Sequence, residues 1–192
     1  MKNKKNEIKT DRRVAFTKSA IKDTLIEEIK QVPFEEIGIV SLCEKAQISR
    51  SAFYLHFGNL YEVLEEVVMD AVETNPALVN VILGDYVTSK LEFANESECY
   101  KSVAKYVGIL KDKTASNILC EYLIKNYKAE YIKNVSDRHG ISQAEAEFIF
   151  YFQTIGLIAA ANEVKSKSTK RWLKLGELRD KLMEKGLKGL AK

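Results

Sequence analysis

The sequence is poor in residues that interrupt helices. Its 192 residues contain two prolines, Pro33 and Pro76, and nine glycines. Proline and glycine dominate the turns between short strands, so their scarcity favours long helices over a fold of many strands. A hydrophobic fraction of 46% is ordinary for a globular protein and too high for general disorder. We therefore expect an all-α fold.

Cysteine and histidine are also scarce. The three cysteines, Cys43, Cys99 and Cys120, include no CxxC pair and have no histidine at a spacing typical of metal ligands, so neither a zinc site nor a disulfide framework is expected. His139 lies in a polar segment without a nucleophile or carboxylate at a defined helical spacing, and no glycine-rich phosphate loop occurs. We expect no metal, no cofactor and no enzymatic activity.

Long apolar runs are missing as well. The most apolar run, residues 148–161, has about 14 residues and contains Gln153 and Thr154, whereas a membrane span needs roughly 20. The N-terminus is charged, and the apolar stretch of a signal peptide does not follow it. The expectation is a cytoplasmic protein with no membrane partner.

Positive charge is concentrated at the start of the chain. Residues 1–22 carry eight lysines and arginines against two acidic residues, whereas the net charge of the whole chain is only +3. A cationic segment on a mildly acidic body suits a polyanion such as DNA, although a solvated tail would have the same composition. We expect residues 1–10 to be a flexible basic arm.

Apolar spacing predicts about nine helices. Val14, Ile21, Leu25 and Ile29 recur at seven- and four-residue steps, which indicates an amphipathic helix from residue 11 that stops at Pro33. Two short helices and a longer helix reaching about residue 74 follow, while residues 77–95 show no clear pattern. Further helices are expected over residues 96–111, 118–135, 142–165 and 169–187, the third of them opened by a capping box from Ser142 to Glu145.

The segment 39–57 has the pattern of two short helices joined by a tight turn. Ser49 is a good N-cap for the second helix, which would direct Phe53 and Phe57 inward. A helix pair of this kind is the minimal device for placing a helix in the major groove of DNA. The same pattern also occurs as plain packing in helical proteins, so the specific residues decide between the two interpretations.

Residues 11–64 resemble the N-terminal domain of the TetR family of transcription regulators. The resemblance rests on Phe34-x-x-Ile37, on Leu42-Cys-Glu-x-Ala46 and on Ile48-Ser-Arg-Ser-x-Phe-Tyr-x-His-Phe57, and covers roughly the first third of the chain. It implies a three-helix DNA-binding domain over residues 11–60 and a C-terminal helical bundle over residues 61–192. The implied partner is double-stranded DNA with a near-palindromic operator.

The resemblance also assigns roles to the second short helix. Arg50 and Ser51 would reach base edges, where arginine can pair with guanine O6 and N7. Leu55 would touch a thymine methyl group, while Tyr54 and His56 would bond phosphates, which fixes the position of the protein without reading sequence. The candidate DNA-binding residues are Ser49, Arg50, Ser51, Tyr54, Leu55 and His56, with Ser49 more a helix cap than a contact.

The sequence departs from the family pattern at four positions. Gly38 stands where a threonine usually caps the first short helix, and Gln47 replaces the usual turn glycine, so a non-glycine residue would occupy a positive φ. Ala52 replaces a common threonine, and Leu60 replaces a lysine that meets the DNA backbone. These losses leave room for weak DNA binding, compensated by the basic arm, or for none.

For the C-terminal two thirds, the sequence predicts dimerisation. The run 148–161 is apolar on all sides and so must be buried on all sides, either at the centre of the bundle or against a second subunit. The helices at about 142–165 and 169–187 are the candidate four-helix interface of a homodimer; closure of the monomer core is the alternative.

An effector site is also implied by the resemblance. A small effector would shift the population of conformations through the helix at 59–74 and so change the spacing of the recognition helices. Its candidate lining residues are Tyr100, Tyr122, Tyr127 and Tyr151, which at helical spacing are also compatible with an ordinary core. The sequence thus favours a dimeric repressor relieved by a small effector; the alternative is a co-regulator that acts through protein contacts with weak or no DNA binding.

Overall fold

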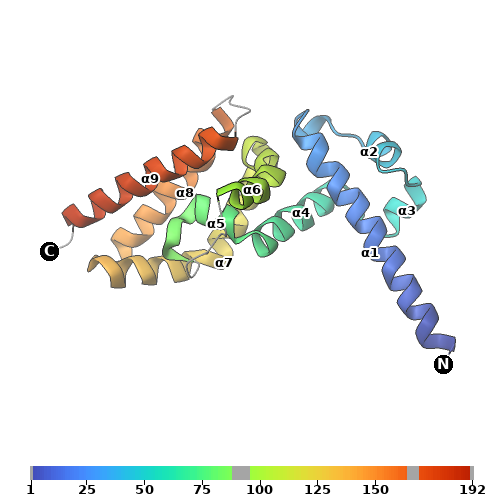
Figure 1. Ribbon diagram of the computed structural model, residues 1–192, viewed down its shortest axis with the longest axis horizontal. Helices are drawn as coiled ribbons and strands as arrows, with labels where there is room; N and C mark the ends of the chain where they lie inside the picture. The colour runs from blue at the N-terminus through green and yellow to red at the C-terminus, as the bar shows by residue number, and fades with distance from the viewer. Residues whose placement is uncertain (1, 88–95, 164–168, 191–192) are drawn as a thin grey trace. The chain divides into compact units, whose positions relative to one another are not determined.

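The computed structural model describes residues 2–87, 96–163 and 169–190. Throughout these ranges the regular structure is helical, with nine α-helices, two short 3-10 helices and no strand (Figure 1). The all-α class and the number of helices expected from the sequence are confirmed.

The chain forms two compact units, Met1–Val68 and Met69–Lys192. The boundary lies inside helix α4 (Leu60–Thr74) rather than at residue 60, where the sequence placed it. The reason is that Val63, Leu64 and Val67, from the first half of α4, are fully buried in the core of the N-terminal unit. Glu66 adds ion pairs with Lys18 and Lys22 of α1.

The N-terminal unit contains α1, one 3-10 helix and the two short helices predicted from the sequence. Its core is made by fully buried residues of α1, α3 and α4, among them Ile21, Leu25 and Phe53. The elements before α4 are α1 (Lys2–Ile29), η1 (Phe34–Glu36), α2 (Ile39–Lys45) and α3 (Arg50–Tyr54).

Helix α1 begins earlier than the sequence pattern indicated. Residues 2–10, expected to be a flexible arm, continue α1 in the structure, whereas the apolar spacing placed its start at residue 11. Apolar spacing reports only the buried part of a helix, and the first buried side chain described in α1 is that of Ile21. No proline or glycine precedes Pro33, so nothing in the sequence stops the helix from extending toward the N-terminus.

The C-terminal unit contains the second half of α4 and five further helices. Helix α6 spans the residues predicted for it, and α7 starts before the predicted residue 118 because the Asp112 side chain accepts a hydrogen bond from the Ala115 amide at 2.8 Å. Residues 88–95 of the unclear segment lie outside the described residues. The elements are α5 (Pro76–Leu83), η2 (Gly84–Tyr86), α6 (Glu96–Lys111), α7 (Lys113–His139), α8 (Gln143–Glu163) and α9 (Thr169–Leu190).

The start of α8 has the predicted capping box. The Ser142 amide donates to the Glu145 carboxylate at 2.7 Å, and the Glu145 amide donates to the Ser142 hydroxyl at 3.3 Å. Helix α8 then runs through the bundle and buries one face, including Phe150, Thr154 and Ile158. By length and composition alone α8 is also able to cross a membrane, which for a single helix is weak evidence.

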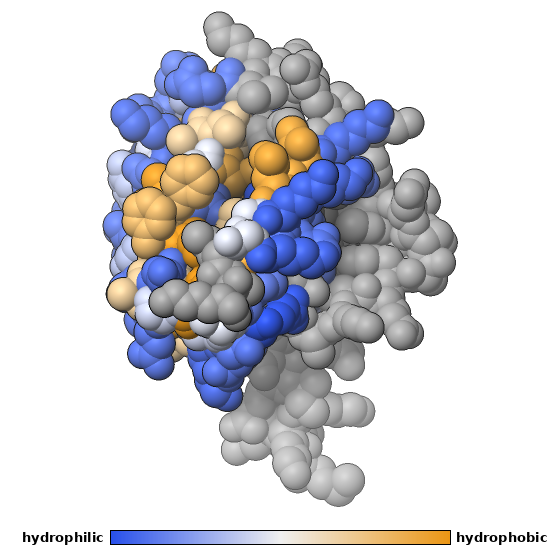
Figure 2. Space-filling model, turned by 90° about the vertical axis from the view of Figure 1, so that its left-hand side faces the viewer, coloured by the Kyte–Doolittle hydropathy of each residue, from blue (hydrophilic) through white to orange (hydrophobic). Residues whose placement is uncertain are grey.

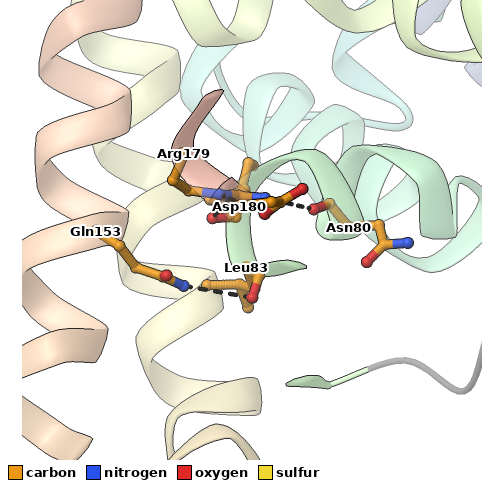
Figure 3. A network of polar contacts seen from close by, with 6 residues as sticks. Asn80, Leu83, Gln153, Arg179 and Asp180 are labelled. Atoms are coloured by element: carbon orange, nitrogen blue, oxygen red, sulfur yellow. Dashed lines mark hydrogen bonds and ion pairs between the residues drawn. The ribbon is translucent and has the colours of Figure 1, made fainter. Parts of the chain in front are cut away.

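A partly buried polar network ties α5 to α8 and α9 (Figure 3). The guanidinium of Arg179 in α9 donates to the backbone carbonyls of Ile82 and of Asn80, the latter at 3.2 Å, and is paired with Asp180 at 2.6 Å. The amide of Gln153 in α8 donates to the carbonyl of Leu83 at 3.3 Å. The last carbonyls of a helix have no partner within the helix, so these side chains complete the C-terminal end of α5.

Candidate nucleic-acid interface

The turn between α2 and α3 is a Schellman motif. The Ile48 amide donates to the Cys43 carbonyl at 3.0 Å and the Gln47 amide donates to the Glu44 carbonyl at 3.1 Å, which are the two hydrogen bonds of that motif. Gln47 occupies its left-handed position with φ 56°. The positive φ expected for this non-glycine residue is therefore confirmed, and the turn keeps its geometry at the cost of backbone strain.

The two short helices are capped differently. Ser49 caps α3, since its hydroxyl accepts a hydrogen bond from the Ala52 amide at 3.1 Å. Gly38 occupies the N-cap of α2 and provides no side-chain hydrogen bond. A Cβ atom added at Gly38 would meet nothing within 4 Å, so the missing cap is not forced by crowding.

Helix α3 divides into a buried side and an exposed side. Phe53 is fully buried and its ring packs against Phe57, with centroids 6.0 Å apart. Tyr54 stacks edge-on against Phe53 with a centroid distance of 5.4 Å, yet 52% of Tyr54 is exposed. This anchoring holds the helix rigidly in place, so its outward side chains are presented in a fixed orientation.

The outward side chains of this segment are the residues that the sequence singled out. Ser49, Arg50 and Ser51 are exposed, and Leu55 has 80% of its surface exposed. His56 is half-buried. An exposed leucine beside an exposed tyrosine and an arginine can supply apolar, hydrogen-bonding and cationic contacts together on a surface formed by about six consecutive residues.

Helix α4 begins next to this surface without a cation. Leu60 is its first residue, and Asn59 caps it by accepting a hydrogen bond from the Glu62 amide at 3.1 Å. The Glu62 carboxylate accepts hydrogen bonds from the Gly58 amide at 2.7 Å and from the Asn59 side chain at 3.1 Å. The negative charge of Glu62 thus lies at the start of α4, two residues after Leu60, the position at which the resemblance implies a lysine.

One interaction that supports this surface was missed in the sequence. The Lys18 ammonium lies 5.0 Å from the centroid of the Phe57 ring and pairs with Glu66 at 2.6 Å. It joins α1, the end of the α3 segment and α4 within the N-terminal unit. Periodicity gives no signal for it, because the three residues come from separate elements: Lys18 from α1, Phe57 from the turn after α3, and Glu66 from α4.

The tyrosines proposed for an effector lie in two places of the C-terminal unit. Tyr122 donates to the Glu73 carboxylate at 3.0 Å, and Glu73 also raises the pKa of Tyr127 after the larger effects of burial and of Glu130. Tyr151 instead packs against Lys128, whose ammonium lies 5.6 Å from the ring centroid. The side chain of Tyr100 lies outside the described residues.

Helices α8 and α9 have an exposed apolar surface. Phe148 and Phe152 have 70% and 69% of their surface exposed, and their rings stack with centroids 6.2 Å apart. Leu178 and Leu182, one turn apart in α9, have 52% and 64% exposed. Figure 2 shows hydrophobic side chains gathered on one face with hydrophilic side chains around them. The chain alone therefore leaves part of the apolar surface of α8 uncovered.

Comparison of the chain with protein-family models, with curated proteins and with solved structures finds no match in any of the three.

Proposed function

We propose that this protein is a homodimeric DNA-binding transcription regulator of the TetR type. The observation that carries the proposal is the exposed side of α3, where Arg50, Ser51, Tyr54 and Leu55 point away from a fully buried Phe53. A helix-turn-helix protein reads bases with the N-terminal residues of its second helix. The first turn of α3 supplies Arg50, whose guanidinium suits the two acceptors of guanine.

The same surface is hard to explain by stability alone. Leu55 contributes little to the core at 80% exposure, whereas a thymine methyl group would give it an apolar partner. Tyr54 has its ring against Phe53, which leaves the hydroxyl end at the exposed edge for a phosphate. The structural cap at Ser49 and the Schellman turn make the surface rigid, so little entropy is lost on binding.

Dimerisation is proposed through α8 and α9. The uncovered stripe of Phe148 and Phe152 needs an apolar partner, and Gly156 and Ala159, which are also exposed, allow a second helix to approach closely. The charges of the two helices are complementary: α8 has three acidic residues and no basic one, whereas α9 has seven basic residues against three acidic ones. In a two-fold dimer α8 of one subunit can therefore pack on α9 of the other.

As a repressor, the dimer would be released from DNA by a small effector bound in the C-terminal unit. Helix α4 belongs to both units, so a shift of its second half would be transmitted to the first half beneath the DNA-binding residues. Such a shift requires that the effector bind one conformation more tightly than the other. An effector that binds without changing operator affinity would contradict this part of the proposal.

A gel-shift titration tests DNA binding. The full-length protein is titrated against the DNA upstream of its own gene and against a random duplex of equal length, at several salt concentrations. Sequence-specific binding is expected, and Arg50→Ala with Tyr54→Phe should abolish the preference for the upstream DNA. The matched control is Lys30→Ala, which also removes one positive charge. Lys30 follows the C-terminal end of α1, outside α3, and pairs with Glu27. Equal loss in the control would refute the assignment to α3.

The alternative is a co-regulator with decayed DNA affinity. It is favoured by the uncapped Gly38 and by Leu60 in place of a cation. Weak binding that does not distinguish the upstream DNA from the random duplex would support it. A regulator must instead prefer the upstream DNA over the random duplex, and this preference must persist when salt weakens the complexes with both DNAs. Phosphate contacts alone could not give such a preference, because they carry no sequence information.

Sedimentation velocity tests the dimer. Phe152→Glu with Leu182→Glu should convert the dimer into a monomer, because two charges per subunit would be buried in an apolar interface. Met69→Glu is the matched control, since Met69 is 38% exposed and lies outside the α8–α9 surface. A wild-type protein that sediments as a monomer at micromolar concentration, or a double variant that stays dimeric, would refute the assignment.

A further inference from the structure

We infer that the N-terminal extension of α1, residues 2–13, is a second DNA-binding element that holds the phosphate backbone through a cationic stripe. The inference deepens the proposed function, on which its biological context rests, but it concerns residues outside the helix-turn-helix. The segment has six basic residues against two acidic ones.

The helical register gathers these charges on one side. At 100° per residue, five of the six basic residues and Phe16 fall within an arc of about 100° of α1. Two residues of this arc have described side chains: Arg13 is exposed, and Phe16 has 77% of its surface exposed. We call this arc the cationic stripe; its basic members are Lys2, Lys5, Lys9, Arg12 and Arg13.

The opposite side of α1 carries the acidic residues of this segment. By the helical repeat, Glu7 and Asp11 share the face of α1 on which the buried residues Leu25 and Ile29 lie further along the helix. By register, the stripe falls on the face of α1 opposite to the one that carries Leu25 and Ile29. Figure 1 shows the N-terminal part of α1 continuing past α2 and α3 within the N-terminal unit. The extension has no part in the described core, whose first α1 member is Ile21.

The arrangement lowers the intrinsic stability of the helix. Basic residues three and four positions apart repel one another by about 0.2–0.5 kcal/mol per pair. Basic residues in the first turn also oppose the positive end of the helix dipole, and α1 has no acidic residue in that turn to offset them. A solvated helix needs no such concentration of like charge. An extended anion next to the stripe removes both penalties.

Duplex DNA fits the length and the charge of the stripe. Eleven helical steps from residue 2 to residue 13 cover about 16 Å, and a duplex carries one phosphate charge per about 1.7 Å of its axis. The stripe therefore spans about half a helical turn of backbone. Its position in the same unit as α3 places both elements on one DNA-binding domain, and its cations offset the missing one at Leu60.

The competing ligand would be an anionic membrane. An interfacial helix needs a broad apolar face beside its basic one. In residues 2–13 the sequence has a single large apolar residue, Ile8, so duplex DNA is the better partner.

The test measures binding of the full-length protein to a random 30-base-pair duplex by fluorescence anisotropy between about 50 and 200 mM salt. A random duplex keeps this test independent of operator recognition. Each lost phosphate contact lowers the slope of log K against log salt by about 0.9. The variant K2Q/K5Q/K9Q/R12Q is therefore expected to lower the slope by about 2 to 4 and the affinity at least tenfold at 100 mM salt. Circular dichroism checks that it is folded.

Two further variants make the result specific. K105Q/K113Q/K125Q/K133Q removes the same charge from exposed positions of α6 and α7, outside the proposed dimer surface, and should leave the slope within 0.9 of wild type. K2R/K5R/K9R keeps the charge and should bind as wild type does. The inference is overturned if the wild type does not bind the random duplex at 50 mM salt, if the two glutamine variants have equal slopes, or if the stripe binds phosphatidylserine vesicles more tightly than DNA.

The outcomes separate this inference from the proposed function. A stripe variant with the wild-type slope, in a protein whose operator preference depends on Arg50, refutes the stripe and leaves the regulator standing. A stripe-dependent slope in a protein that has no sequence preference supports the stripe and leaves the co-regulator as the function.

Discussion

Replacing Gln47 by glycine should stabilise the N-terminal unit, although glycine usually weakens a helix-rich protein. Gln47 has φ 56° and is exposed, so the substitution removes backbone strain without removing a buried side chain. An L-residue in the left-handed region costs about 1–2 kcal/mol. Glycine loses about 0.5–1 kcal/mol more conformational entropy on folding. The net expected gain is about 0.5–1 kcal/mol.

The assay is native-state hydrogen exchange of the full-length protein. The Ile48 amide, which donates to the Cys43 carbonyl, reports opening of the turn itself. A gain of about 1 kcal/mol slows its exchange about fivefold, provided that exchange follows local or global opening. Urea unfolding followed by circular dichroism gives an independent measure, with a separate transition fitted for each of the two units.

A series at the same position decides whether φ is the cause. Gln47→Ala keeps the strain and should lie within about 0.5 kcal/mol of wild type, as exposed substitutions do. Gln47→Val should be destabilised by more than about 1 kcal/mol, since a β-branched residue tolerates positive φ poorly. The expected order is Gly above Gln and Ala, with Val last. If Gln47→Gly lowers stability and Gln47→Val does not, the turn has negative φ and the reasoning fails.

Three other predictions concern the helix ends and the buried core. Gly38→Thr should raise the unfolding free energy by about 0.5–1 kcal/mol by adding a cap to α2 in open space, as urea unfolding against a Gly38→Ala control would show. Arg179→Met should destabilise the C-terminal unit by about 2–4 kcal/mol, because it leaves the carbonyls of Asn80 and Ile82 without a donor. Unfolding of this unit can be followed by the fluorescence of Trp172, the single tryptophan. Arg179→Lys is the milder control. Tyr131→Phe should be neutral or stabilising by about 1 kcal/mol, because the Tyr131 hydroxyl is buried without a hydrogen bond. Burial also raises the pKa of Tyr131, so wild-type stability should fall as pH rises above the ordinary value of 10.0, and unfolding titrations of the variant should lack that part of the fall.

Capping residues in the sequence predicted two of the boundaries between helices. The box from Ser142 to Glu145 set the start of α8, and the Asn75-Pro76 pair separates α4 from α5, where Asn75 accepts a hydrogen bond from the Leu78 amide at 3.3 Å. The start of α7 was missed because the apolar spacing begins only at Ile118. Asp112, three residues before Ala115, was the available signal.

The periodicity of apolar residues could not predict contacts between segments that are distant in the sequence. Arg179 reaches the end of α5 across almost a hundred residues, and its position in α9 marks it only as one of many basic residues. The apolar composition of residues 148–161 predicted burial on every side. It did not distinguish burial within the bundle from burial against a second subunit. In the described residues α8 packs against α5, α6 and α7 and leaves Phe148 and Phe152 exposed in the single chain.

The two proposed DNA contacts would contribute differently to recognition. Helix α3 has five residues, so only about one turn meets the bases, and a good arginine–guanine pair is worth about 1–3 kcal/mol of discrimination. The proposed cationic stripe would meet phosphates, which every sequence presents alike, and its contribution would weaken as salt is added. Raising the salt concentration should therefore reduce the affinity for operator and random duplex together, while their ratio, which depends on α3, changes little. With leucine at position 60 and the proposed stripe at residues 2–13, most phosphate contacts of this chain would lie outside the helix-turn-helix, and sequence preference would still depend on α3.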